Sequence, residues 1–189
     1  MVLNDRRLGY STSLQIRQRK SQPAPGEEKN LLKSHGHDWR SPATEQKPVY
    51  VHNGFHFSVL VCSELQNIEY RSKLQGYVDC LFVISWNKDL ETFSALVDSA
   101  SLDVHSYVAL SNNLRYGDSR VRSPAKDSFK RDVCRVRGGV NNQLVVVEID
   151  PRILRAQQSR AKRWPDDGDA YKPAPEGFAI SPSRFITPS

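Results

Sequence analysis

Two mainly apolar runs constrain the fold of this chain more than any other feature of its sequence. They occupy residues 55–62 (FHFSVLVC) and 78–86 (VDCLFVISW), and runs of this kind are typical of central strands that are buried on both faces of a sheet. Between them, residues 63–76 carry apolar side chains at helical spacing and end at Gly76, which favours the termination of a helix. The middle of the chain is therefore expected to form a strand, a helix and a second strand in succession.

The flanking sequence extends this alternation. Asn53 and Gly54 both tolerate positive φ angles, so they predict a tight hairpin turn immediately before the first apolar run. Residues 90–106 have the apolar spacing of an amphipathic helix. Further strands are expected at residues 10–20, 107–113, 132–139 and 143–150, a short helix at residues 27–36, and a loop at residues 114–127. Strands and helices that alternate and then give way to consecutive strands predict an α/β fold whose sheet is covered on at least one side.

The 189 residues suit one domain followed by a tail. We expect the domain to span residues 1–150, because the composition changes beyond Asp150 to a stretch rich in Pro, Arg and Ser. Residues 151–189 are expected to form a short helix and then an irregular, basic and Pro-rich arm that docks on the fold or on a partner. The sequence has neither a membrane-length apolar run nor the pattern of a signal peptide, which predicts a cytoplasmic protein that does not contact membranes.

The cysteines and the known motifs narrow the possible chemistry. Cys62, Cys80 and Cys134 form an odd number without C-x-x-C spacing, which favours reduced thiols over a disulfide framework or a structural zinc site. The sequence also lacks the phosphate-loop, dinucleotide-binding and zinc-protease motifs. We therefore look for chemistry that side chains carry out by themselves.

Cys62 is the residue best placed for such chemistry. It ends a predicted buried strand and opens a predicted helix, whose N-terminal amides would favour a thiolate and could hold an oxyanion. An inert buried cysteine is the competing interpretation. Upstream, Lys20 and the adjacent acids Glu27 and Glu28 lie around a Pro-rich loop, and a lysine with a carboxylate would complement a thiol nucleophile. The residues alone do not bring these groups together.

The order of these features resembles that of the carbon–nitrogen hydrolase (nitrilase/amidase) superfamily, from about residue 10 to residue 150. The resemblance is carried by Lys20 and by the segments PAPGEE, VLVCSE, DCLFVISWN, YVALSNN, YGDSRVRSP and VVVEID. It implies a stacked α-β-β-α sandwich, of which this chain would hold only a part. The same stretch is also similar to nitrilase-like domains attached to bacterial reverse-transcriptase-like proteins.

The resemblance implies roles for particular residues. Cys62 matches the nucleophile, Lys20 matches the lysine that stabilises the tetrahedral intermediate, and Glu27 or Glu28 matches the second glutamate, with Glu27 favoured. The residues expected at the substrate pocket are Ser63, Glu64 and Trp86. No metal or organic cofactor is implied, because the nucleophile, the base and the oxyanion stabiliser are all side-chain groups.

One group that the resemblance implies has no match. The family's first glutamate precedes the lysine, whereas the only acid before Lys20 is Asp5, which does not fit the motif. Either the chain lacks the N-terminal strand-helix-strand part of the domain, or the proton shuttle has been lost. The implied function is hydrolysis of a nonpeptide C–N bond, in a small amide or nitrile, through a covalent cysteine intermediate. The chain would be inactive alone if it lacks this glutamate.

The alternative is a non-catalytic interaction module with the same fold. Arg131, Arg135, Arg137 and the basic segment at residues 155–163 would then bind nucleic acid or a partner protein. The net charge of +6 is spread along the chain, which also fits an ordinary solvated surface. For either function, an incomplete sandwich exposes apolar surface, which predicts a homo-oligomer or a complex with a partner chain.

Overall fold

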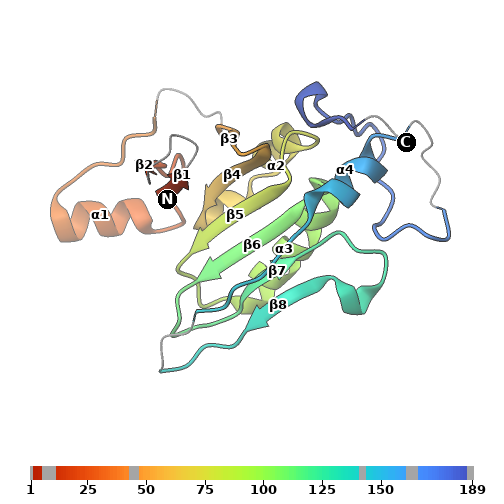
Figure 1. The fold of residues 1–189 in the computed structure, drawn as a ribbon. Coiled ribbons are helices and arrows are strands. Elements are labelled where there is room, and N and C mark those ends of the chain that lie inside the picture. Colours follow the sequence, from red (N-terminus) through yellow and green to blue (C-terminus); the bar gives the residue numbers. More distant parts are fainter. Residues whose placement is uncertain (1, 6–11, 43–46, 141–143, 161–165, 187–189) are drawn as a thin grey trace.

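The computed structural model describes residues 2–5, 12–42, 47–140, 144–160 and 166–186. Its main feature is a six-stranded sheet with the strand order β3-β4-β5-β6-β7-β8 (Figure 1). The strands are β3 (Tyr50–His52), β4 (Phe55–Val61), β5 (Cys80–Ser85), β6 (Tyr107–Asn112), β7 (Ser119–Arg122) and β8 (Asp132–Val136). The central strands β4, β5 and β6 are parallel, so their carboxyl ends share one edge of the sheet.

Apolar side chains pack on both faces of this sheet. The helices that cover it are α2 (Ile68–Leu74), α3 (Leu90–Asp103) and α4 (Pro151–Gln158). Val83 of β5 belongs to the larger core beneath α2 and α3, whereas its neighbour Phe82 points to the other face, where Leu154 of α4 is buried. In Figure 1, α4 lies in front of the sheet and α3 behind it. The predicted α/β class is therefore confirmed, as a six-stranded sheet that helices cover.

The two apolar runs form β4 and β5, as predicted, and the hairpin turn before β4 is also confirmed. Asn53 has a φ angle of 49° and Gly54 a φ angle of 76°, the positive values that a two-residue hairpin turn requires. Both strands are buried because they lie inside the sheet and not at an edge.

Of the three helices predicted before Asp150, two are present as expected and the third is divided. Helix α1 (Glu27–His35) ends at Gly36, which adopts a left-handed conformation, and α3 forms within the predicted amphipathic segment. Between β4 and β5, a short 3-10 helix, η1 (Cys62–Gln66), precedes α2. The side chain of Asn67 separates them, because it accepts hydrogen bonds from the first amides of α2 and so starts a new helix.

Two predictions in the C-terminal half are wrong. The segment at 114–127 is not a loop throughout, since β7 lies inside it. The segment at 143–150 was expected to be a strand, but its described part, residues 144–150, contains none, and residue 143 lies outside the described residues. Leu144 and Val146 are 92% and 88% exposed. A strand needs a neighbour for its backbone hydrogen bonds, and no described residue supplies one here.

The N-terminal residues form a small sheet of their own. β1 (Val2–Asp5) and β2 (Thr12–Gln15) pair antiparallel, so the predicted strand at 10–20 is confirmed only in part. After β2 the chain runs towards α1 past the six-stranded sheet, where Tyr50 of β3 donates a hydrogen bond to the side chain of Gln18 at 2.9 Å. In the described part of the chain, no helix is long and apolar enough to cross a membrane.

The C-terminal segment is attached to the start of β5 through Asp79. This fully buried carboxylate pairs with Arg155 of α4 and with Arg184. The Arg184 guanidinium lies 2.9 Å from Asp79, and the residue is only 1% exposed. Arg184 also donates to the carbonyl oxygen of Gly76 at 2.6 Å. Gly76 has a φ angle of 78°, and a Cβ atom there would lie 2.0 Å from the carbonyl oxygen of Ala179. The predicted helix after Asp150 is therefore followed by an arm that docks on the fold.

Candidate functional site

Cys62 occupies a tight turn at the carboxyl end of β4. Its φ angle is 52°, a left-handed conformation that is uncommon for residues other than glycine and is enriched at functional sites. The residue opens η1 and is partly buried against the larger core. The sequence prediction that Cys62 ends a buried strand and begins a helical segment is confirmed, although that segment is a 3-10 helix.

The sulfur of Cys62 has a hydroxyl group beside it. Ser85 Oγ donates a hydrogen bond to Cys62 Sγ over 3.7 Å. The register of the parallel pair β4–β5 places Val61 opposite Ile84, so the next residues along the two strands are Cys62 and Ser85. Sequence analysis missed Ser85, but its position is a usable signal: it is the small polar residue at the end of the second apolar run.

Glu64, which was expected at the substrate pocket, is buried next to the Cys62 turn. Its side chain is fully buried, and both carboxylate oxygens accept hydrogen bonds. Oε2 accepts from the backbone amide of Val61 at 2.8 Å, and Oε1 accepts from the backbone amide of Ser21 at 2.5 Å. One carboxylate therefore joins the residue that precedes Cys62 to the residue that follows Lys20.

Lys47 neutralises this buried carboxylate and was not found from the sequence. Its ammonium group lies 2.6 Å from Glu64 Oε1, and its side chain is 2% exposed. The same nitrogen donates to Ser21 Oγ at 2.7 Å and lies 4.8 Å from the centre of the Tyr70 ring. The sequence around Lys47 offers no signal for this role, because its partner is 17 residues away.

Lys20 forms a second lysine–glutamate pair with Glu27, the acid that was favoured over Glu28. The ammonium of Lys20 contacts Glu27 Oε2, which also accepts from the backbone amide of Ala24 at 2.6 Å. Burial disfavours the charged form of Glu27, but these hydrogen bonds and the charge of Lys20 outweigh it and lower the pKa of the Glu27 carboxyl group. Glu28 is exposed at the start of α1. Glu27 is therefore ionised at neutral pH and keeps Lys20 in place.

The Lys20–Glu27 pair and Cys62 are connected through Glu64 and not by a direct hydrogen bond or ion pair between described residues. Among the described residues, neither Lys20 nor Glu27 makes a hydrogen bond or ion pair with the Cys62 sulfur. The Ser21 amide and the Val61 amide bind opposite oxygens of the same carboxylate. This brings the Lys20 segment against the Cys62 turn, although the two are 42 positions apart in the sequence.

The two other expected pocket residues differ in their surroundings. Ser63 has a buried hydroxyl oxygen that finds no hydrogen-bond partner among the described residues. Trp86 follows Ser85 at the same edge of the sheet and is 76% exposed. In this structure Trp86 is thus an open aromatic surface beside the turn and not an enclosed wall.

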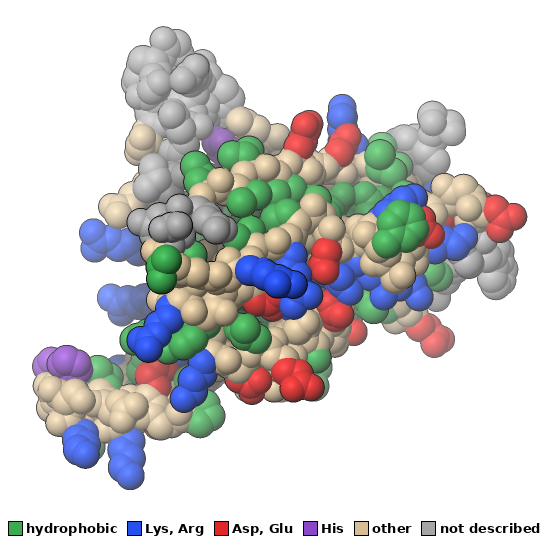
Figure 2. Space-filling view, turned by 90° about the horizontal axis from the view of Figure 1, so that it is seen from below, with side chains coloured by type: hydrophobic (Ala, Val, Ile, Leu, Met, Phe, Trp, Pro, Cys, Tyr) green, Lys and Arg blue, Asp and Glu red, His purple; other side chains and the backbone are tan. Residues whose placement is uncertain are grey.

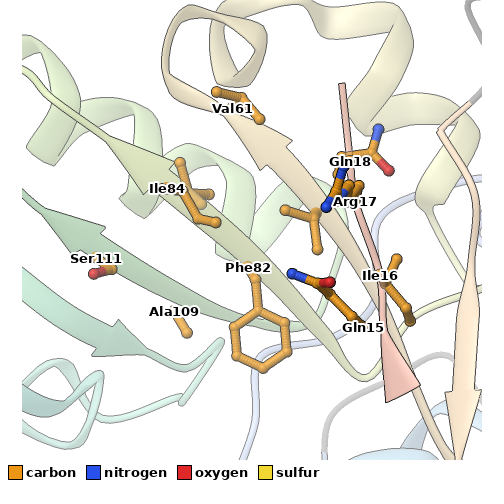
Figure 3. Close-up of a pocket in the computed structure, with 11 residues that line it drawn as sticks. Gln15, Ile16, Arg17, Gln18, Val61, Phe82, Ile84, Ala109 and Ser111 are labelled. Atoms are coloured by element: carbon orange, nitrogen blue, oxygen red, sulfur yellow. The ribbon is translucent and has the colours of Figure 1, made fainter. Parts of the chain in front are cut away.

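An apolar groove of about 550 Å³ runs along the face of the sheet that carries α4 (Figure 3). It is lined by Gln15, Ile16, Arg17, Gln18, Val59, Val61, Phe82, Val83, Ile84, Ala109 and Ser111. Figure 3 shows Val61 and Ile84 at one end of the groove, with Phe82 deeper in it. Val61 and Ile84 directly precede Cys62 and Ser85, so the groove reaches the edge of the sheet that carries the Cys62 turn, whereas the Cys62 side chain packs against the larger core on the other face.

Of the basic residues proposed for a nucleic-acid interface, residues 161–163 lie outside the described part of the chain, and three of the others are engaged within the protein. Arg135 pairs with Asp118 at 2.5 Å and Arg155 with buried Asp79. The side chain of Arg131 donates to a backbone carbonyl oxygen at 3.0 Å. Figure 2 shows acidic side chains interspersed with the basic ones on the side that it displays. Steering of a polyanion requires a continuous basic patch, so these contacts do not favour the nucleic-acid alternative. In the described part of the chain, no three His, Cys, Asp or Glu side chains form a group that could hold a metal ion.

Comparison with known proteins gives a partial structural likeness. No protein-family model and no curated protein matches the chain. Among solved structures, the chain is similar to an amidase from Nesterenkonia sp., with 19% identity and a TM-score of 0.48 over 69% of this chain and 49% of that chain. A variant of the amidase from Nesterenkonia AN1, described as belonging to the nitrilase superfamily, gives 18% identity and a TM-score of 0.49 over 69% and 48%.

A third structure shows the Nesterenkonia sp. AN1 amidase after Michael addition of acrylamide at its active-site cysteine, with 18% identity and a TM-score of 0.48 over 68% and 49%. The present chain spans about half the length of these amidases.

Proposed function

We propose that this chain is a carbon–nitrogen hydrolase-like domain that attacks small nonpeptide amides or nitriles through Cys62. The observation that carries the proposal is the bridging carboxylate of Glu64, which ties the Lys20–Glu27 pair to the turn of Cys62. A thiol in a strained turn, with a cation and a carboxylate on the adjoining segment, has the parts that covalent acyl transfer requires.

In the first step, Cys62 Sγ attacks the carbonyl carbon of the amide, and the carbonyl oxygen becomes an oxyanion. The ammonium of Lys20 is the group that stabilises this negative charge. As the tetrahedral intermediate collapses, the amide nitrogen takes up the proton that the thiol has lost, the C–N bond breaks and ammonia leaves, while the acyl group stays on sulfur as a thioester. Water then attacks the thioester carbon and releases the carboxylic acid.

Proton transfer is the weakest part of this arrangement. The lowered pKa of the Glu27 carboxyl group suits an anion that holds Lys20, but makes it a poor proton acceptor near neutral pH. Among the described residues, Glu27 is the one carboxylate that contacts Lys20. We therefore propose that acylation of Cys62 is faster than release of the acid, and that an additional carboxylate would accelerate turnover.

The groove beside Val61 and Ile84 supports an apolar acyl group on the substrate. Its lining is mainly aliphatic and aromatic, with polar groups from the segment Gln15, Arg17 and Gln18 along one side. Binding pockets of this composition hold apolar ligand groups and orient them with a few polar contacts. We propose that linear aliphatic amides react faster with this site than acetamide does.

The test is to incubate the wild-type chain with a series of aliphatic amides and nitriles, and to measure ammonia release together with the intact protein mass. We expect an acyl adduct on Cys62, accompanied by slow ammonia release that added acetate accelerates. Cys62→Ala should abolish both signals, whereas Cys134→Ser, which removes a partly buried thiol in β8, should leave them unchanged. Absence of the adduct and of ammonia release in the wild type would refute the proposal.

A further inference from the structure

Two lysine–glutamate pairs flank the Cys62 turn, and they differ in burial. The outer pair, Lys20–Glu27, is partly exposed, with its Glu27 side chain 40% accessible. The inner pair, Lys47–Glu64, is 2% and 0% accessible. We propose that the inner pair is a positioning device: it holds the Lys20 segment against the Cys62 turn and so keeps the thiol reactive. This inference rests on the proposed function, since it takes Cys62 as the reacting group and Lys20 as its cationic neighbour.

The hydrogen bonds that the Glu64 carboxylate accepts from the described residues serve this purpose. Its three donors are the Val61 amide, the Ser21 amide and the Lys47 ammonium, so one carboxylate collects the two segments that carry the reacting groups. Glu64 itself is only two residues from Cys62. A shift of the carboxylate would therefore move both segments at once.

Lys47 is held as firmly as Glu64. An ammonium group has three donors, and the surroundings of Lys47 supply the Glu64 carboxylate, the Ser21 hydroxyl and the face of the Tyr70 ring. The Ser21 hydroxyl group thus accepts a hydrogen bond from Lys47, and the Ser21 backbone amide donates one to Glu64. The three side chains close a compact network directly behind the turn.

Stability alone is a poor explanation for this pair. Removing two charges from water is costly, and buried ion pairs can often be replaced by neutral side chains with little loss of stability. The hydrogen bonds of Lys47–Glu64 join the two segments that the proposed chemistry uses, and the Lys47 ammonium also packs on the Tyr70 ring of the larger core. These two facts together point to a role in geometry.

The test measures the reactivity of Cys62 with iodoacetamide as a function of pH, which needs no substrate. All proteins carry Cys134→Ser, and Cys80 contributes no signal because its burial raises the pKa of its thiol and blocks access. Lys47→Met alone would leave an uncompensated buried carboxylate and could fail to fold, so the main variant is Lys47→Met with Glu64→Gln. Circular dichroism establishes that it is folded.

In the folded Lys47→Met/Glu64→Gln protein, we expect the rate of alkylation at pH 7 to fall about tenfold, because the Lys20 segment is no longer held against the Cys62 turn. The exposed pair Lys73–Glu69 provides the matched control, with Lys73→Met/Glu69→Gln giving the wild-type profile. A folded double variant with a wild-type profile would overturn the inference.

Lys20→Met then separates the inference from the proposed function. If the inner pair acts by holding Lys20, the effects of Lys20→Met and of Lys47→Met/Glu64→Gln will not add when combined, since both remove the same influence. Additive effects would overturn the inference. If Lys20→Met alone leaves the alkylation rate unchanged, the role of Lys20 in the proposed function fails. The rate measured for Lys47→Met/Glu64→Gln then decides by itself whether the inner pair positions the Cys62 turn.

Discussion

The hydroxyl group of Ser85 lies 3.7 Å from the sulfur of Cys62, at the adjoining ends of two parallel strands. A hydrogen bond to a thiolate favours the ionised form. We therefore expect Ser85→Ala to slow the alkylation of Cys62 at pH 7 by about threefold, in line with the modest net value of one hydrogen bond. Ser111→Ala, at the exposed end of the neighbouring strand β6, is the matched control and should have no effect on this rate.

Glu27 and Glu28 are adjacent in sequence, but their contacts predict opposite results. Glu27→Gln removes the anion that holds Lys20 and should slow amide hydrolysis by about 10- to 100-fold. Glu28→Gln changes an exposed carboxylate and should leave the rate close to that of the wild type. Ammonia release measures both. Equal losses in the two variants would contradict the assignment of Glu27 as the second glutamate.

Asp79 should make the stability of the fold depend on acid pH. Burial opposes its charged form, but Arg155 and Arg184 more than compensate and hold the pKa of Asp79 below the ordinary value of 3.8. The unfolded chain therefore takes up a proton first as the pH falls. The stability from Asp79 is complete above about pH 4 and is lost as the pH falls towards the lower pKa of the folded state.

Asp79→Asn tests this contribution. It leaves two arginines without their buried partner, so we expect a loss of about 3–5 kcal/mol in the free energy of unfolding at pH 7. The difference from the wild type should shrink as the pH approaches 3. Urea denaturation followed by circular dichroism measures both effects. Asp127→Asn removes a carboxylate from an exposed pair with Lys130 and should leave the unfolding midpoint unchanged at pH 7.

Gly76 and Gly177 share a φ angle of 78°, but only Gly76 lies against another part of the chain. Alanine at Gly177 should cost about 1 kcal/mol, the ordinary price of a left-handed conformation. Alanine at Gly76 should cost more, because its Cβ atom would displace Ala179 and break the hydrogen bond from the Ser181 amide. Thermal denaturation compares the two, and limited proteolysis should cut the arm faster in Gly76→Ala alone.

Ile84 offers a test of the groove that leaves the thiol untouched. Ile84→Trp should fill the end of the groove next to Ser85. We expect KM for hexanamide to rise about tenfold while KM for acetamide changes little, because a hydrophobic pocket discriminates by about 1–3 kcal/mol per methylene group. Steady-state kinetics with both amides measures this. An equal rise of KM for both amides would mean that the acyl group does not bind in this groove.

The sequence predicted the elements whose apolar pattern matches their burial, and failed where other forces act. β4 and β5 were predictable because most of their residues are apolar and buried. β7 was not, because its inward-facing Arg120 is buried through an ion pair with Asp118, 2.6 Å away. Residues 144–150 have a strand-like composition, but a strand also requires a partner, and composition carries no information about that.

The candidate site was predictable to a similar extent. Cys62 was found because its place at the end of an apolar run is a local property of the sequence. Lys47 was not, since a buried lysine is recognisable only through the acid that it meets, and Glu64 comes from a different segment. Glu64 was assigned to the pocket because its spacing from Cys62 is visible, whereas its burial is a consequence of tertiary packing.

The length of β5 separates the anchor of the C-terminal arm from the contact with Cys62. Asp79, which anchors the C-terminal arm, precedes this strand, and Ser85, which contacts Cys62, ends it. Six residues of strand span about 20 Å, twice the distance of about 10 Å over which charges act in 0.1 M salt. The arm can therefore open and exchange its amide hydrogens without disturbing the opposite edge. Thermostability could be engineered at one end of the sheet while reactivity is selected at the other.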